Sequence, residues 1–413
     1  MVGYERVDEE IHLNALMYGG DVVNFTFKTT IFSCFIAYIV QAIINNFSPL
    51  LFVTFHETYQ IPMSEITLLV TINFAVQLTV DVIATKYADR IGYRKLIVAA
   101  HGMAALGLVF LGVLPEYMDP FSGILIAGCT CAVGGGLIEV LISPIMESCP
   151  TDNKETAMSL LHSFYCWGHV GVILISTVFF YVVGIDSWKL LAFVWALIPL
   201  ANTFIFLKTP IASLISEGEV GMTLKELFDS KVFWCLMVMM VCSGASEQSV
   251  SQWASAFAEQ GLGIDKTAGD LAGPMTFAIC MGIARAVYGK YGEHLELDQF
   301  MKGSTLLCIF SYLLISLSPA PALSLAGCAV CGFSVGIMWP GTFSKASALL
   351  RNGGTAMFAL LALGGDLGCS AGPTVVGFVS ELVGGNMKQG ILAAIIFPVV
   401  LSVCLFSRKL KSR

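Results

Sequence analysis

Charged residues are scarce in this sequence. Asp, Glu, Lys and Arg make up 12% of its 413 residues, whereas about 25% is usual in soluble globular domains. Hydrophobic residues reach 56%, and the mean hydropathy is +0.79. This balance excludes a water-soluble domain of this size and predicts a chain that lies largely within a membrane.

Motifs of nucleotide-using proteins and enzymes are also missing. The glycines at 134–136 and 364–365 lie in apolar segments, and no Lys-Ser or Lys-Thr pair follows them as a phosphate loop requires. There is no Ser/His/Asp or Cys/His arrangement in a stretch that could form an aqueous enzyme domain, and no basic surface for nucleic acid. We therefore predict neither an enzyme, nor an ATP-driven pump, nor a nucleic-acid-binding protein, and no cofactor.

Long apolar segments fill the chain instead. About 20 residues of helix cross the ~30 Å hydrocarbon core of a bilayer. We predict twelve such helices, near 29–55, 64–87, 95–114, 121–149, 156–184, 187–207, 232–259, 268–292, 300–317, 319–349, 353–383 and 387–407. The predicted fold is an all-α membrane protein with twelve transmembrane helices.

The thirteen cysteines all fall within or at the ends of these segments. This placement argues against an extracellular disulfide framework. Cys129 with Cys131, and Cys328 with Cys331, have metal-like spacing, but no His or acid accompanies them as a further ligand. We interpret the cysteines as small buried residues and predict no metal site.

One connection is long and charged, and it divides the chain into two halves. The predicted domains are an N-terminal tail (1–28), a six-helix bundle (29–207), a linker (208–231), a second six-helix bundle (232–407) and a C-terminal tail (408–413). With both tails in the cytoplasm, only Lys189, Lys266 and Lys388 of the 22 Lys and Arg residues fall outside, if Arg285 is counted inside. This asymmetry predicts cytoplasmic termini, and we expect the cell membrane as the location.

Short sequence repeats relate the two halves. Thr-Ala-Met at 156–158 recurs at 355–357, Gly-His-Val-Gly at 168–171 is echoed by Gly-Asp-Leu-Gly at 365–368, and Ala-Gly-Cys at 127–129 recurs at 326–328. The order is the same and the spacing is nearly constant. A duplicated six-helix unit is therefore expected, as in transporters that bind solute midway through the membrane.

The loop between the second and third segments carries a recognisable motif. Its residues Asp89, Arg90, Gly92, Arg94 and Lys95 resemble the signature of the major facilitator superfamily, Gly-x-x-x-Asp-Arg-x-Gly-Arg-Lys. Thr85 replaces the leading glycine, and Tyr93 stands where a basic residue is common. A basic loop that only sets topology is the alternative. The resemblance implies two pseudo-symmetric six-helix bundles, with Asp89, Arg90 and Arg94 as gating residues.

Within that superfamily the chain is most similar to the fucose permease-type sugar transporters. The similarity rests on Gly134 to Glu139 followed by Ser143-Pro144, on Asn45-Asn46-Phe47, and on the stretch from Glu247 to Trp253. The membrane aspartate that these permeases carry after their asparagines is missing, and Ser48-Pro49 occupies its place. The resemblance implies sugar transport, with proton coupling that lacks one expected carboxyl group.

Ionisable residues within the segments are functional candidates, because a charge at the bilayer centre costs at least ~2.5–3.5 kcal/mol. Glu139 lies deep in the fourth segment beside Gly135 and Ser143, a setting suited to a carboxyl group that exchanges a proton. A structural glutamate bonded to a neighbouring helix is the alternative. Further candidates for proton coupling are Asp366, Glu247 and His169, although a buried histidine is more often structural.

Polar stripes on apolar helices predict the path of the solute. Asn73, Gln77 and Asp81 are spaced by four residues and share one helix face, and Asp81 and Arg285 could form a gate between the halves. Arg285 could equally extend alone towards the cytoplasm. Amides suit hydroxyl-rich ligands and aromatic rings suit the apolar face of a sugar. The predicted solute-binding residues are Gln41, Asn45, Asn46, Asn73, Gln77, Gln248, Gln252, Trp253, Trp167 and Trp339.

The sequence thus predicts a monomeric secondary transporter for a small polar solute, moved by alternating access between two bundles in the lipid bilayer. A sugar carried with protons is the preferred hypothesis. Sodium coupling and uniport stay open. A multidrug or metabolite exporter of the same fold is the main alternative, and a receptor that binds without transporting is another.

Overall fold

The computed structural model describes residues 25–150, 154–211, 222, 224–291, 296–350 and 354–407, and these are helical without any strand. The predicted tails therefore lie mostly outside the described residues, as do residues 212–221 and 223 of the predicted linker. The elements of the first half are α2 (Phe27–Asn46), η1 (Ser48–Leu51), α3 (Phe52–Tyr59), α4 (Met63–Ile91), α5 (Tyr93–Tyr117), α6 (Pro120–Ser148), α7 (Lys154–Val183), η2 (Ile185–Ser187) and α8 (Trp188–Lys208).

The elements of the second half are more fragmented. They are α9 (Leu224–Asp229), α10 (Lys231–Ser251), α11 (Ala254–Ala256), η3 (Phe257–Gly261), α12 (Lys266–Asp270), η4 (Leu271–Met275), α13 (Thr276–Tyr291), α14 (Leu297–Leu317), α15 (Pro321–Val335), α16 (Met338–Leu349), α17 (Gly354–Leu382), α18 (Met387–Ala393) and α19 (Ile396–Phe406).

Twelve membrane-spanning helices, as predicted, account for these described elements except α9, which lies in the predicted linker. Ten helices in the described part are long and apolar enough to cross a bilayer by length and composition alone. The other two predicted spans are α10 with its extension to Gly261, which is rich in Ser and Gln, and α17, which is rich in Gly. At about 1.5 Å per residue, the 29 residues of α17 are more than long enough to cross.

Several predicted spans are interrupted where the sequence weakens the helix. The first span breaks between α2 and η1, next to Pro49, because proline lacks the amide hydrogen that continues a helix. The seventh and eighth spans contain wide π-type turns at η3 and η4, the second of which includes Pro274. The tenth span breaks near Gly336. Such local widening often accompanies functional sites.

Two ends of the bundle can be distinguished by their turns. We call the end with the α4–α5 turn at Gly92 the inner end, following the predicted orientation, and the end with the α5–α6 turn at Asp119 the outer end. Gly92 has a φ of 97°, which only glycine adopts readily, so it allows the tight turn that the motif predicted. The Asp119 side chain accepts a bond of 2.9 Å from the Ser122 amide and caps α6.

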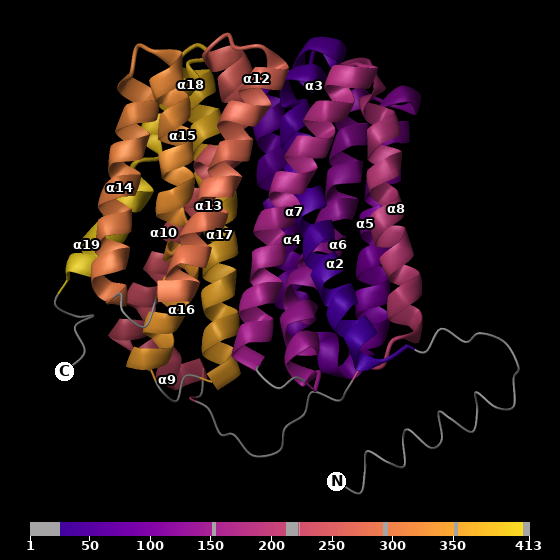
Figure 1. Cartoon of the computed structure of the whole chain (residues 1–413), viewed down its shortest axis with the longest axis vertical. Coiled ribbons are helices and arrows are strands. Elements are labelled where there is room, and N and C mark those ends of the chain that lie inside the picture. Colours follow the sequence, from indigo (N-terminus) through magenta and orange to yellow (C-terminus); the bar gives the residue numbers. More distant parts are fainter. Residues whose placement is uncertain are drawn as a thin grey trace, which may run out of the picture.

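The helices form two bundles that lie side by side (Figure 1). Helices α2 to α8 pack mainly with one another, as do α10 to α19. Small residues permit close approach inside each bundle: a Cβ atom on Gly134 would lie 2.8 Å from the Ala104 amide nitrogen of α5. The bundles meet chiefly through α4 with α17 and through α7 with α13.

Contacts between the bundles are tight at the outer end. The Thr71 and Thr374 hydroxyls lie 2.5 Å apart between α4 and α17, and a Cβ atom on Gly377 would lie 2.8 Å from the Thr67 Cβ. Elements α12 and η4 also pack on α7, and α11 packs on η1. The outer end is therefore closed in this structure, and this closure brings α17 against α4 deep in the protein.

Candidate functional site

Three carboxyl groups from both bundles gather where α4, α6 and α17 meet. One oxygen from each of Asp81, Glu139 and Asp366 lies within 4.8 Å of the others. Asp81 is 3% exposed and Asp366 is 6% exposed. We call these residues the carboxyl cluster. Asp366 comes from the second bundle, so the cluster is complete only when α17 lies against the first bundle.

Two amides hold Glu139 in place. Gln77 Nε2 donates to Glu139 Oε2 at 2.6 Å, and Gln41 Nε2 donates to the same oxygen at 3.3 Å. The glycines before Glu139 make room for this arrangement. A Cβ atom on Gly135 would lie 3.3 Å from the Gln41 side-chain oxygen, and one on Gly136 would lie 2.7 Å from Asp81 Oδ1. The glycine run at 134–136 thus lets polar side chains of α2 and α4 lie directly against α6.

The chemistry of the carboxyl cluster follows from its charge. Three negative charges this close would repel one another strongly in a medium of low dielectric constant. The arrangement therefore suits groups that bind protons or a cation and release them again. The oxygens are also near enough to ligate a metal ion, a possibility that the sequence did not predict.

A second charged cluster lies between α10, α13 and α7. Arg285 Nη2 lies 3.8 Å from Glu247 Oε2, and Arg285 Nη1 lies 3.1 Å from the Cys166 sulfur. Arg285 Nε donates to the Gly336 carbonyl at 3.3 Å. Arg285 and Asp81 therefore belong to different clusters in this conformation, and the gate predicted between them stays a prediction.

A chain of amides connects the second cluster to the first bundle. Gln248 Nε2 lies 3.4 Å from Glu247 Oε1, and Gln252 Nε2 donates to Gln248 Oε1 at 3.0 Å and to the Asn45 carbonyl at 3.2 Å. Asn45, Asn73 and Gln252 also line a cavity of about 50 Å³. Four of the seven amide residues that the sequence proposed for solute binding thus lie along this chain and cavity, whereas Gln41 and Gln77 bond Glu139 in the carboxyl cluster. Asn46 instead donates to the Ala42 carbonyl of its own helix at 2.9 Å.

Two histidines of α7, His162 and the proton-coupling candidate His169, lie near the charged residues. The His162 ring contacts Tyr38 edge to face at 5.3 Å, and the Tyr165 and His169 rings lie 6.4 Å apart. His162 and His169 are within electrostatic range of Arg285. His169 is 2% exposed, which fits a structural histidine as well as a proton carrier.

The three tryptophans proposed as walls of a sugar site have different surroundings. Trp253 is 1% exposed, donates to the Pro373 carbonyl at 3.0 Å and packs on Phe52. Trp339 packs on Phe343 and so closely on Gly365 that no side chain fits there. Trp167 is 55% exposed, on the face of α7 that also exposes Leu174 and Val178. The structure does not bring these rings together around one cavity.

The motif residues at the inner end are only partly described. The side chains of Asp89 and Arg90 lie outside the described residues. Arg94 Nη1 donates to the carbonyls of Phe206 and Leu207 at 3.0 and 2.9 Å, the last turn of α8. A cation at a helix C-terminus is favourable because it faces the negative end of the helix dipole. Arg94 therefore ties α5 to α8 within the first bundle.

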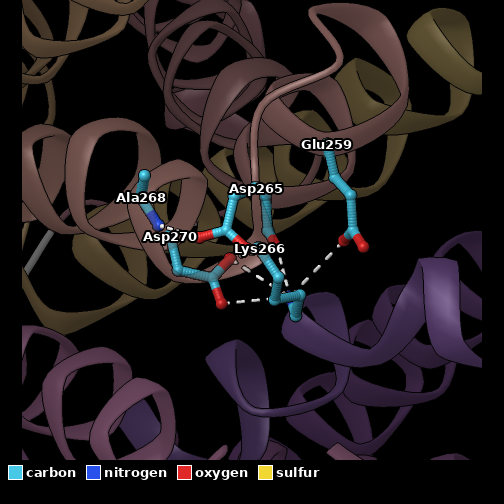
Figure 2. A network of polar contacts seen from close by, with 6 residues as sticks. Glu259, Asp265, Lys266, Ala268 and Asp270 are labelled. Atoms are coloured by element: carbon cyan, nitrogen blue, oxygen red, sulfur yellow. Dashed lines mark hydrogen bonds and ion pairs between the residues drawn. The ribbon is translucent and has the colours of Figure 1, made fainter. Parts of the chain in front are cut away.

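Sequence reasoning missed a polar network at the outer end (Figure 2). Lys266 lies between Glu259 and Asp270, with Lys266 Nζ 3.0 Å from Asp270 Oδ2 and 3.8 Å from Glu259 Oε2. Ser255 donates to Asp270 Oδ1 at 2.5 Å. Asp270 is 1% exposed, so it depends on these partners. The four-residue spacing of Lys266 and Asp270 was the available signal.

We expect Lys266→Gln to destabilise the protein, because Asp270 would remain buried without its cation. Removing one partner of a buried pair costs about 3–5 kcal/mol. The measurement is the thermal unfolding of the detergent-purified protein. Lys266→Gln combined with Asp270→Asn should restore much of the melting temperature, because both charges are then gone. Lys189→Gln, which breaks an exposed pair with Glu116, is the control and should change little. Equal melting of Lys266→Gln and the control would contradict the expectation.

Comparisons with known proteins fit this fold. A bacterial homologue of the human lysosomal transporter Spinster, solved in an inward-facing and unoccupied conformation, superposes with a TM-score of 0.74 at 14% identity, over 92% of this chain and 96% of that one. The fucose:proton symporter FucP of E. coli superposes with a TM-score of 0.65 at 14% identity, over 93% and 98% of the two chains. These identities establish the fold alone.

No curated protein matches the sequence. A family profile, described as Major Facilitator Superfamily, matches residues 30–406, which is nearly the whole chain and includes both bundles and the carboxyl cluster. The resemblance proposed from the loop motif is thereby confirmed. This chain is an integral membrane protein that belongs to the Major Facilitator Superfamily.

Proposed function

We propose that the protein is a secondary active transporter that moves a sugar together with protons by alternating access. The observation that carries this proposal is the carboxyl cluster, in which Asp366 of the second bundle meets Asp81 and Glu139 of the first. A neighbour of the same fold, FucP, is named as a fucose:proton symporter, which supports the choice of solute class and ion.

The cluster suggests how protons drive the cycle. With the outer end open, α17 withdraws from α4, and the carboxyl groups of the two bundles separate. Closing the outer end brings them together, which costs little only when protons have neutralised most of the charge. Proton binding would therefore favour the outer-closed conformation, and proton release to the inner side would let the bundles part again.

The same proposal includes the setting of the transporter. The Lys and Arg asymmetry supports cytoplasmic termini. The proposed setting is the cell membrane, with a single chain as the transporting unit.

The proposal is tested with the full chain reconstituted in proteoliposomes. Counterflow of labelled L-fucose, D-galactose or D-glucose should occur without a gradient, and an inward proton gradient should drive accumulation that a protonophore abolishes. Accumulation driven only by sodium would overturn proton coupling. If none of these sugars exchanges, and only amphiphilic drugs raise the melting temperature, the exporter alternative replaces the sugar transporter.

A further inference from the structure

Arg285 lies in the protein interior with few good hydrogen-bond acceptors. Its guanidinium contacts two sulfur atoms, Cys166 Sγ at 3.1 Å and Met281 Sδ at 3.9 Å, and one carbonyl, that of Gly336, at 3.3 Å. Sulfur is a weak acceptor. The side chain is 20% exposed, so solvent or a solute can reach it. Among the described residues, these three contacts leave two of the five N–H donors of Arg285 without a partner.

Glu247 faces Arg285 without bonding to it. The separation of 3.8 Å between Arg285 Nη2 and Glu247 Oε2 exceeds the ~2.7–2.9 Å of a charge-assisted hydrogen bond. Within the described part of the chain, the other carboxylate oxygen has only the long contact of 3.4 Å from Gln248. The Glu247 side chain is 11% exposed. The opposite charges of Arg285 and Glu247 thus face each other without a hydrogen bond between them.

The separation of the two charged groups suits a hydroxyl group that lies beside them and bonds to both. A hydroxyl both donates and accepts, so it can accept from Arg285 and donate to Glu247 at once. An oxygen about 2.8 Å from each atom easily bridges two atoms 3.8 Å apart. A solute with a net charge fits less well, because an anion at Arg285 would lie beside Glu247 and a cation at Glu247 would lie beside Arg285.

The pair, which belongs to the second bundle, also has polar surroundings from the first bundle. Tyr165 of α7 is within electrostatic range of Glu247, and His162 and His169 of the same helix are within range of Arg285. Glu139 of the carboxyl cluster is likewise within range of Glu247. Because Arg285 already contacts Cys166 of α7 at 3.1 Å, a solute held by the pair would contact the first bundle as well.

We propose that Glu247 and Arg285 bind the transported solute directly, clamping one hydroxyl or two adjacent hydroxyls of a neutral sugar or polyol. This inference rests on the proposed sugar transport, and it replaces the coupling role of Glu247 and the gating role of Arg285 with a role in specificity.

The test measures sugar binding by the purified full chain. D-Glucose, D-galactose, L-fucose and D-mannitol are titrated first, followed by the monodeoxy derivatives of the tightest binder. Glu247→Gln and Arg285→Gln should weaken binding at least about tenfold, because each removes a hydrogen bond to a charged group. Arg285→Lys, which keeps the charge but loses the planar fork, guards against a folding failure of Arg285→Gln.

The deoxy sugars separate binding from a structural role. The wild type should disfavour one monodeoxy derivative about tenfold or more, and the variants should lose that preference, because the partner of the missing hydroxyl is gone. Lys302→Gln, which breaks an ion pair within α14, is the control and should behave as the wild type.

The outcomes distinguish the two proposals. If the wild type binds a sugar and the variants bind it equally well, or lose affinity equally for the parent and the deoxy sugar, the clamp is overturned and sugar transport stands. If the wild type binds no sugar or polyol, both proposals are overturned.

Discussion

Glu139→Gln should abolish the uphill accumulation of sugar while counterflow continues at a rate within about threefold of the wild type. Glutamine matches glutamate in shape and can still bond the amides of Gln41 and Gln77, but it cannot take up a proton. Without a proton to carry, the transporter can exchange sugar for sugar yet cannot use a proton gradient. Proteoliposomes measure both activities with the same preparation.

A matched control makes this result specific. Glu57→Gln introduces the same chemical change in α3 at an exposed position near the outer end, and accumulation should survive it. Asp366→Asn should resemble Glu139→Gln, since the residue completes the same carboxyl cluster. Accumulation by Glu139→Gln at the wild-type level would remove Glu139 from the coupling mechanism.

The broad fold was predictable because the bilayer leaves few choices. Backbone groups in hydrocarbon must bond within their own helix, so each long apolar segment is read directly as a span. The breaks inside spans were less visible. Pro49 and Pro274 are plain in the sequence, but whether proline kinks, widens or ends a helix depends on the helices packed around it.

The candidate site was predictable as separate residues and not as an arrangement. Asp81 and Glu139 stood out because carboxyl groups are rare in apolar helices. Periodicity placed Asp81 on a stripe but could not say that this stripe meets α17, so Asp81 was paired with Arg285 at the sequence level. The contact with Asp366 depends on how the two bundles close, which no local pattern records.

Aromatic residues illustrate the same limit. Trp253 and Trp167 both lie in predicted spans, yet the first is 1% exposed and the second 55% exposed. Which side of a helix faces lipid and which faces another helix is not evident when every side is apolar. The lipid surface and the protein core use the same residues here, so tryptophan alone did not locate a sugar site.

Gly377→Val should reduce transport at least about tenfold without loss of folded protein. Gly377 of α17 lies against the Thr67 side chain of α4, and a Cβ atom there would be 2.8 Å from the Thr67 Cβ. Thr67 cannot easily move aside, because it is fully buried and its hydroxyl donates to the Met63 carbonyl at 2.8 Å. Valine would therefore keep the outer end from closing.

This steric effect acts on one conformation only. When the outer end opens, α4 and α17 separate and the added methyl groups have room, so the variant should accumulate in the outer-open state. Hydrogen exchange followed by mass spectrometry should then show faster deuteration of peptides near 63–71 and 374–382 than in the wild type. Gly303→Val is the control, because no atom lies within 4 Å of a Cβ atom built at that position of α14.

The same variant tests the link between closure and coupling. Because Asp366 lies on the helix that valine holds away, the carboxyl cluster should also fail to assemble, and accumulation and counterflow should fall together. This pattern differs from that of Glu139→Gln, where only accumulation is lost. Transport by Gly377→Val at the rate of the control would show that the contact of α4 with α17 at the outer end is not part of the transport cycle.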